Sequence, residues 1–138
     1  MPGFSFYYMS EGFDEKEMSP IDSQREVNER LDFLLRATDV EDIFDNIQNC
    51  IDTTDNTLQE CYRDMLFVIR MGINLLESTL NKYSIKHREI KNLKSIYNYL
   101  NDYIEKISDK TTVGDIKNEI SGEILKMSEI IKNLKNER

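Results

Sequence analysis

The chain has 138 residues, a formal net charge of −8 and two cysteines. The acidic balance argues against a nucleic-acid-binding protein, because phosphate recognition needs a basic surface, and two cysteines are too few for a disulfide scaffold. A chain of this length fits one domain with a sizeable core. With only two prolines and five glycines, long helices are favoured.

The charges are unevenly distributed along the chain. Residues 1–57 contain 14 acidic and 4 basic residues, whereas residues 58–138 contain 12 acidic and 14 basic residues. An acidic amino-terminal half and a nearly neutral remainder favour ion pairing between the two, either within one molecule or between copies.

Residues 1–18 are predicted to form an aromatic arm that precedes a single helical domain, residues 19–138. Its first aromatic side chains alternate with other residues, the period-two pattern of an extended segment with one apolar face. Such a segment either lies on its own bundle or on that of a second copy, or it docks onto another protein. The candidate partner-binding residues of this arm are Phe4, Phe6, Tyr7, Tyr8 and Phe13.

The first helix is predicted over residues 20–37. Ser19 suits the N-cap, Pro20 the first helical position and Asp22 the first turn. Apolar residues then recur at helical spacing toward the core.

The second helix is predicted over residues 39–52, with Thr38 and Glu41 as a capping box. The turn-forming run DTTDNT, residues 52–57, separates it from the next helix. The apolar spacing also permits one continuous helix from about 39 to 83, so this alternative stays open.

The third helix, about residues 57–82, contains MLFVIRMGINLL, residues 65–76, the most apolar run of the chain. This run is well short of the roughly 20 apolar residues that a membrane span needs, and Arg70 interrupts it. Since its apolar side chains occupy nearly every side, we expect other helices to cover it on most sides. If Arg70 is buried, we expect an acidic partner from the amino-terminal half.

The two cysteines are placed symmetrically about the predicted turn between the second and third helices. Cys50 and Cys61 lie equally far from its midpoint, on the apolar stripes of their helices. They are expected to face each other as two core thiols, with a disulfide as the alternative.

The fourth and fifth helices are predicted over residues 85–107 and 112–136. Ser84 suits the cap of the fourth, and Thr112 with Asp115 forms a capping box for the fifth. Gly122 weakens the fifth helix and suggests a close contact between helices. The fourth carries a heptad seam formed by Ile90, Leu93, Tyr97, Leu100, Ile104 and Ile107. Together the segments predict an all-α fold, an antiparallel bundle of about five helices around the central apolar helix.

A basic patch is the one candidate for phosphate binding. We expect it to be a solvated helix face that pairs with the acidic half of the chain, and phosphate binding is the alternative. The patch consists of Lys82, Lys86, Arg88, Lys91 and Lys94.

No motif for catalysis, metal binding or cofactor binding survives inspection. His87 is the only histidine, which excludes the usual paired-histidine metal sites. Residues 52–63 resemble a calcium loop only faintly, since Arg63 occupies the last ligand position. There is no glycine-rich phosphate loop. We therefore expect no cofactor, no metal and no enzyme.

The composition favours a non-enzymatic interaction or assembly protein that acts through helical oligomerisation and the aromatic arm. Its expected partner is another protein or a second copy of the chain, with no membrane partner. The alternative is a small regulatory protein that binds nucleic acid or a small ligand through the basic patch. The amino terminus lacks a secretory signal pattern, so a soluble, cytoplasmic protein is expected.

Overall fold

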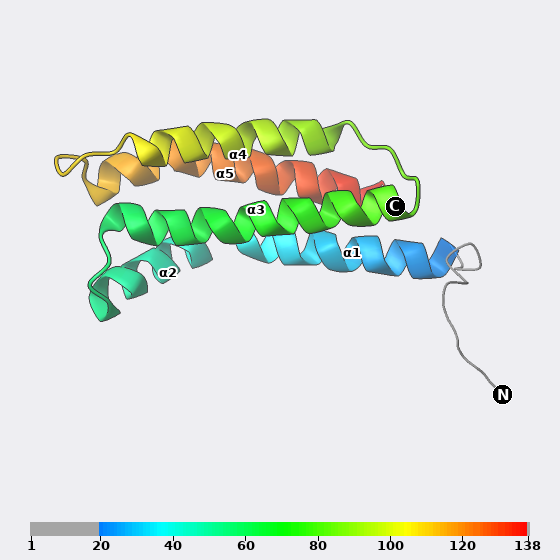
Figure 1. Ribbon diagram of the computed structural model, residues 1–138, viewed down its shortest axis with the longest axis horizontal. Helices are drawn as coiled ribbons and strands as arrows, with labels where there is room; N and C mark the ends of the chain where they lie inside the picture. The colour runs from blue at the N-terminus through cyan, green and yellow to red at the C-terminus, as the bar shows by residue number, and fades with distance from the viewer. Residues whose placement is uncertain (1–19, 138) are drawn as a thin grey trace.

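The computed structural model describes residues 20–137, and this part of the chain forms five α-helices and no strand. This result confirms the predicted all-α fold (Figure 1). The helices are α1 (Pro20–Ala37), α2 (Val40–Thr53), α3 (Leu58–Lys82), α4 (Glu89–Glu105) and α5 (Val113–Asn136).

Four of the helices form an antiparallel bundle. α3 packs on both α1 and α4, and α5 also packs on both α1 and α4. α2 continues from the end of α1 in roughly the same direction and packs mainly on α3 (Figure 1). The first position in the bundle is therefore occupied by two consecutive helices, α1 and α2.

The split between α1 and α2 occurs at Thr38 and Asp39. Thr38 is buried, and its hydroxyl donates to the Leu34 carbonyl at 2.8 Å. Asp39 caps α2 by accepting from the Asp42 amide at 3.0 Å. The prediction that Thr38 is the cap is wrong, because its side chain already bonds to the last turn of α1.

The turn between α2 and α3 exists, so the alternative of one continuous helix is wrong. α3 begins with the predicted capping box, in which Thr57 and Glu60 exchange side-chain and backbone hydrogen bonds. α5 begins in the same way at Thr112 and Asp115. These two predicted helix starts are confirmed.

Ser84 ends α3 instead of starting α4, which corrects the predicted start at residue 85. Its φ of 57° lies in the left-handed region. The Ser84 amide donates to the Asn81 carbonyl at 3.1 Å, and the Ile85 amide donates to the Leu80 carbonyl at 2.8 Å. This pair of bonds is the Schellman pattern of a helix C-terminus.

Buried apolar residues from all five helices form one core, and Gly72 sets the closest approach of α1 to α3. A Cβ atom built on Gly72 would lie 2.7 Å from Leu34 Cδ2 and 2.9 Å from Phe33 Cε1. A Cβ atom on Gly122 would meet nothing within 4 Å. The close helix contact suggested for Gly122 is therefore wrong, and Gly72 makes one instead.

These two glycines provide a matched pair of substitutions. We expect Gly72→Ala to lower the free energy of unfolding by about 1–2 kcal/mol, because overpacking against the buried Leu34 outweighs the gain in helix propensity. We expect Gly122→Ala to raise it by about 1 kcal/mol. Urea unfolding of both variants measures the difference, and an increase in both would contradict the close packing at Gly72.

Tyr62 is a fully buried core residue of α3. Its hydroxyl has no hydrogen-bond partner among the described residues. Burial, reinforced by Tyr103, raises the pKa of Tyr62 from its ordinary value of 10.0 to about 12. The folded protein therefore holds this proton more tightly than the unfolded chain does.

This difference predicts an alkaline loss of stability. The contribution of Tyr62 is fully present below about pH 10 and is lost as the pH rises toward about 12, because only the unfolded chain ionises readily in that window. In Tyr62→Phe, we expect the free energy of unfolding to be unchanged or about 1 kcal/mol higher at pH 8, and to fall less steeply above pH 10. Urea unfolding across this range tests both expectations, and parallel pH curves for the two proteins would contradict them.

Candidate protein-binding surface

α3 presents a group of apolar side chains to solvent. The exposed fractions are 60% for Phe67, 42% for Met71 and 39% for both Val68 and Leu75. Steps of four residues place Phe67, Met71 and Leu75 on one side of the helix, with Val68 beside them. Single exposed apolar residues are ordinary, whereas a cluster of them is a candidate interaction surface. We call these four residues the α3 apolar face.

The α3 apolar face corrects the prediction that other helices cover residues 65–76 on most sides. In a bundle, each helix buries the stripe that points toward its neighbours. Here that stripe contains Leu66, Ile69, Ile73 and Leu76, all nearly inaccessible. No helix among the described residues covers the opposite side.

Arg70 is exposed beside the α3 apolar face. The acidic partner is predicted only for a buried Arg70, so that prediction does not apply. Together with Asn74, it lines a small cavity between α3 and α4. No acidic side chain of residues 20–137 forms an ion pair with it.

A groove of about 290 Å³ lies between α2 and α3. Its apolar lining includes Ile43 and Ile47 from α2, and Met65 and Val68 from α3. Because Val68 also belongs to the α3 apolar face, the two surfaces are continuous. The volume lies at the lower limit of small-molecule pockets and suits a few inserted side chains. We call this feature the α2–α3 groove. The rest of its lining consists of Arg36, Ala37, Asp42, Asn46, Cys50, Cys61 and Asp64.

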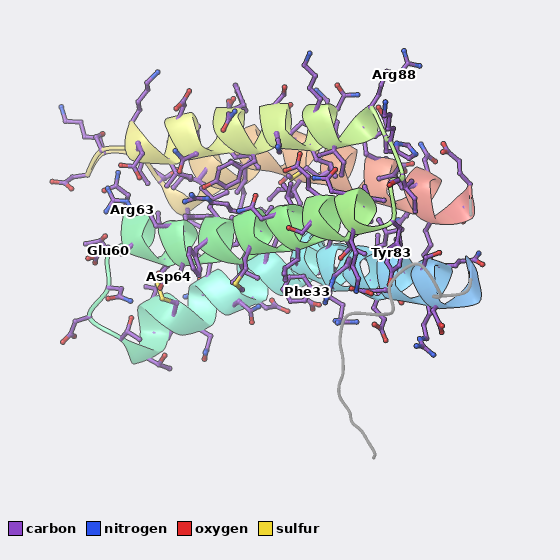
Figure 2. All side chains as sticks on the ribbon, turned by 45° about the vertical axis from the view of Figure 1, so that its right-hand side comes forward. Phe33, Glu60, Arg63, Asp64, Tyr83 and Arg88 are labelled. Carbon is purple, nitrogen blue, oxygen red and sulfur yellow. A yellow bond between two sulfur atoms is a disulfide. The ribbon has the colours of Figure 1, made fainter. Side chains whose placement is uncertain are left out.

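Carboxylates border the α2–α3 groove on both walls. Asp42 comes from α2 and Asp64 from α3, and Figure 2 shows Asp64 near the start of α3, on the side of α2. Residues 37–62 contain seven acidic residues and no lysine, arginine or histidine. Arg63 does not neutralise this border, because it donates two hydrogen bonds, of 2.7 and 2.8 Å, to Glu105. The Arg63 guanidinium lowers the pKa of Glu105.

A disulfide between Cys50 and Cys61 joins the two walls of the groove, with their Cα atoms 6.1 Å apart. The predicted facing arrangement is confirmed. The expectation of two free thiols is wrong, and the alternative of a disulfide holds. The bond closes the short α2–α3 hairpin and limits how far α2 can move from α3.

We expect Cys50→Ala/Cys61→Ala to lower the free energy of unfolding by about 3 kcal/mol, because a crosslink across a loop this short restricts the unfolded chain by about that amount. Urea unfolding with and without dithiothreitol measures the effect. The wild-type protein should lose stability on reduction, whereas the double variant should not respond. Equal stability of oxidised and reduced wild-type protein would contradict the prediction.

The basic patch lies around the α3–α4 connection and mixes with acidic side chains. Lys82 pairs with Glu26 at 3.1 Å, and Lys94 pairs with Glu77 at 2.7 Å. Figure 2 shows Arg88 pointing away from the bundle. Two of the five patch residues are therefore engaged within the molecule, and the structure gathers no purely cationic surface here.

Glu26 also holds the end of α3 against α1. Its carboxylate accepts a hydrogen bond from the Tyr83 hydroxyl at 2.6 Å. This bond, followed by the contribution of Lys82, lowers the pKa of Glu26, while the same hydrogen bond raises the pKa of Tyr83. Glu26 contacts both Lys82 and Tyr83 at the end of α3, and we interpret the cluster as a structural contact.

The remaining candidates for chemistry are not brought together. His87 Nε2 lies 3.1 Å from a carboxylate oxygen of Glu137. Among residues 20–137, no group of three histidine, cysteine, aspartate or glutamate residues is arranged to hold a metal ion. Nor does any helix in that range have the length and apolar content needed to cross a bilayer.

The predicted aromatic arm lies outside the described residues, as do all five of its candidate partner-binding residues, and so does the Ser19 cap. The α3 apolar face was not identified from the sequence. The signal was present, because Phe67, Met71 and Leu75 repeat at steps of four on the side opposite Leu66 and Ile73. In so apolar a run, spacing alone does not separate the outer stripe from the buried one.

Comparisons with protein-family models, with curated proteins and with solved structures find no match to this chain.

Proposed function

We propose that this protein is a non-enzymatic interaction protein that binds another protein chain through the α3 apolar face and the adjoining α2–α3 groove. The observation that carries the proposal is the exposure of Phe67, Val68, Met71 and Leu75 side by side on one helix. Burying such a surface against a partner is favourable by roughly 25 cal/mol per Å² of apolar area.

The partner expected from the sequence is either a different protein or a second copy of the chain. The aromatic arm, residues 1–18, remains a proposed second contact. The cytoplasmic location also remains a prediction. The Cys50–Cys61 disulfide opposes it, because lasting disulfides are rare in reducing compartments.

Selection of helix-forming peptides from a display library tests the proposal. We expect peptides enriched on the intact chain to bind Phe67→Glu/Met71→Glu at least about tenfold more weakly. The reason is that the two side chains would be buried by the bound peptide, and losing this burial costs more than about 1.4 kcal/mol. Both positions are exposed, so the variant should keep the wild-type melting temperature.

A matched control places the same charges on another helix. Val113 and Leu125 are exposed apolar residues of α5, with exposed fractions of 38% and 55%, and Val113→Glu/Leu125→Glu should leave peptide binding unchanged. Light scattering of the intact chain tests self-association, since a dimer that Phe67→Glu/Met71→Glu converts to a monomer identifies a second copy as the partner. A monomeric chain that also yields no peptide dependent on the α3 apolar face would contradict the proposed function.

A further inference from the structure

The shape of the α2–α3 groove suits an inserted helix. On α3 its lining extends from Cys61 to Val68, a length of about 10 Å, or two helical turns. An amphipathic helix places apolar side chains at intervals of three and four residues, which fits two or three anchors into a groove of this length. The apolar side chains that would receive them are Met65 and Val68, above Ile43 and Ile47, whose exposed fractions are only 3% and 4%.

The charges around the groove restrict the chemistry of the occupant. Asp42 of α2 and Asp64 of α3 line the groove and are exposed, and no ion pair among residues 20–137 involves either of them. The dipole of α2 favours Asp42 in its first turn, but it does not account for Asp64, which lies on α3. Arg36 is the one cation in the groove lining. The lining therefore carries one more negative than positive charge, and it favours cationic partners over anionic ones.

This charge distribution argues against three other occupants. The aromatic arm carries four acidic residues and a single lysine, so it is repelled. A second copy carries a net charge of −8, and in its basic patch Lys82 and Lys94 already pair with Glu26 and Glu77. Nucleic acids are polyanions. A basic segment of a different protein fits both the apolar lining and the carboxylates.

The groove is also held in shape before a partner arrives. The disulfide links Cys50 on α2 to Cys61 on α3, and α2 packs on α5 as well as on α3. A surface fixed in advance loses less conformational entropy on binding.

We propose that the α2–α3 groove binds a lysine- or arginine-rich amphipathic helix from a different protein. Its apolar side chains contact mainly Met65 and Val68, over the buried Ile43 and Ile47, and its basic side chains face Asp42 and Asp64. This inference rests on the proposed function, because it names the chemistry of the partner for that same surface.

Fluorescence anisotropy with the intact, oxidised chain and three labelled peptides of about five turns tests this proposal. The first peptide has leucines on one helical face and lysines on the other. The second replaces each lysine with glutamate, and the third scrambles the first so that its composition stays the same but its apolar face is lost. We expect the first peptide to bind at least about tenfold more tightly than the scrambled one, and the acidic peptide not to bind.

Two double variants with the same change in net charge distinguish attraction by the groove carboxylates from attraction by the net charge of the whole protein. Asp42→Asn/Asp64→Asn should weaken binding of the basic peptide by about three- to tenfold, since each exposed charge pair contributes modestly. Glu29→Gln/Glu129→Gln makes the same change in charge at exposed positions outside the groove lining and should change binding by less than about twofold. Met65→Ser/Val68→Ser should weaken binding through the apolar lining.

The outcomes distinguish this inference from the proposed function. Equal binding of the basic and scrambled peptides, or equal effects of the two charge variants, overturns the inference by showing general charge attraction. Tighter binding of the acidic peptide, of a peptide with residues 1–18, or of a second copy overturns it while the proposed function stands. If none of these binds and the library selection is also empty, both proposals fail.

Discussion

The end of α1 at Thr38 and Asp39 determines how much of α3 is covered. Up to that point α1 lies close against α3, and the absence of a side chain at Gly72 permits the approach of Leu34 and Phe33. Beyond it, the hydroxyl of Thr38 bonds back to Leu34, and the carboxylate of Asp39 starts a new helix. α2 therefore runs at an angle to α1 (Figure 1). A groove lies between α2 and α3.

Much of the helical framework was predictable because local chemistry determines it. The capping boxes at Thr57 and Thr112 depend only on side chains three residues apart. The facing cysteines followed from their equal distances to a turn. Each of these features involves a short stretch of chain, so tertiary contacts change it little.

The predictions failed where tertiary packing or an unusual backbone conformation determines the local structure. Ser84 resembles a helix cap, but its left-handed conformation ends the preceding helix, and nothing in the sequence requires a serine to adopt it. Gly72 and Gly122 look alike in sequence, yet an added Cβ atom would meet another helix only at Gly72. The α3 apolar face was missed for a similar reason, because the side of an apolar helix that stays exposed depends on where its neighbours lie.

Charge is distributed unevenly along the length of the bundle, so the bundle has an electric dipole. The end formed by α2 and the α2–α3 turn carries the acidic run, and the α3–α4 connection lies at the opposite end (Figure 1). That connection contains Lys86 and Arg88. A molecule with such a dipole turns in the field of an approaching charged protein before contact. A cationic partner would therefore meet the acidic end first, and its rate of association would fall as added salt screens the field.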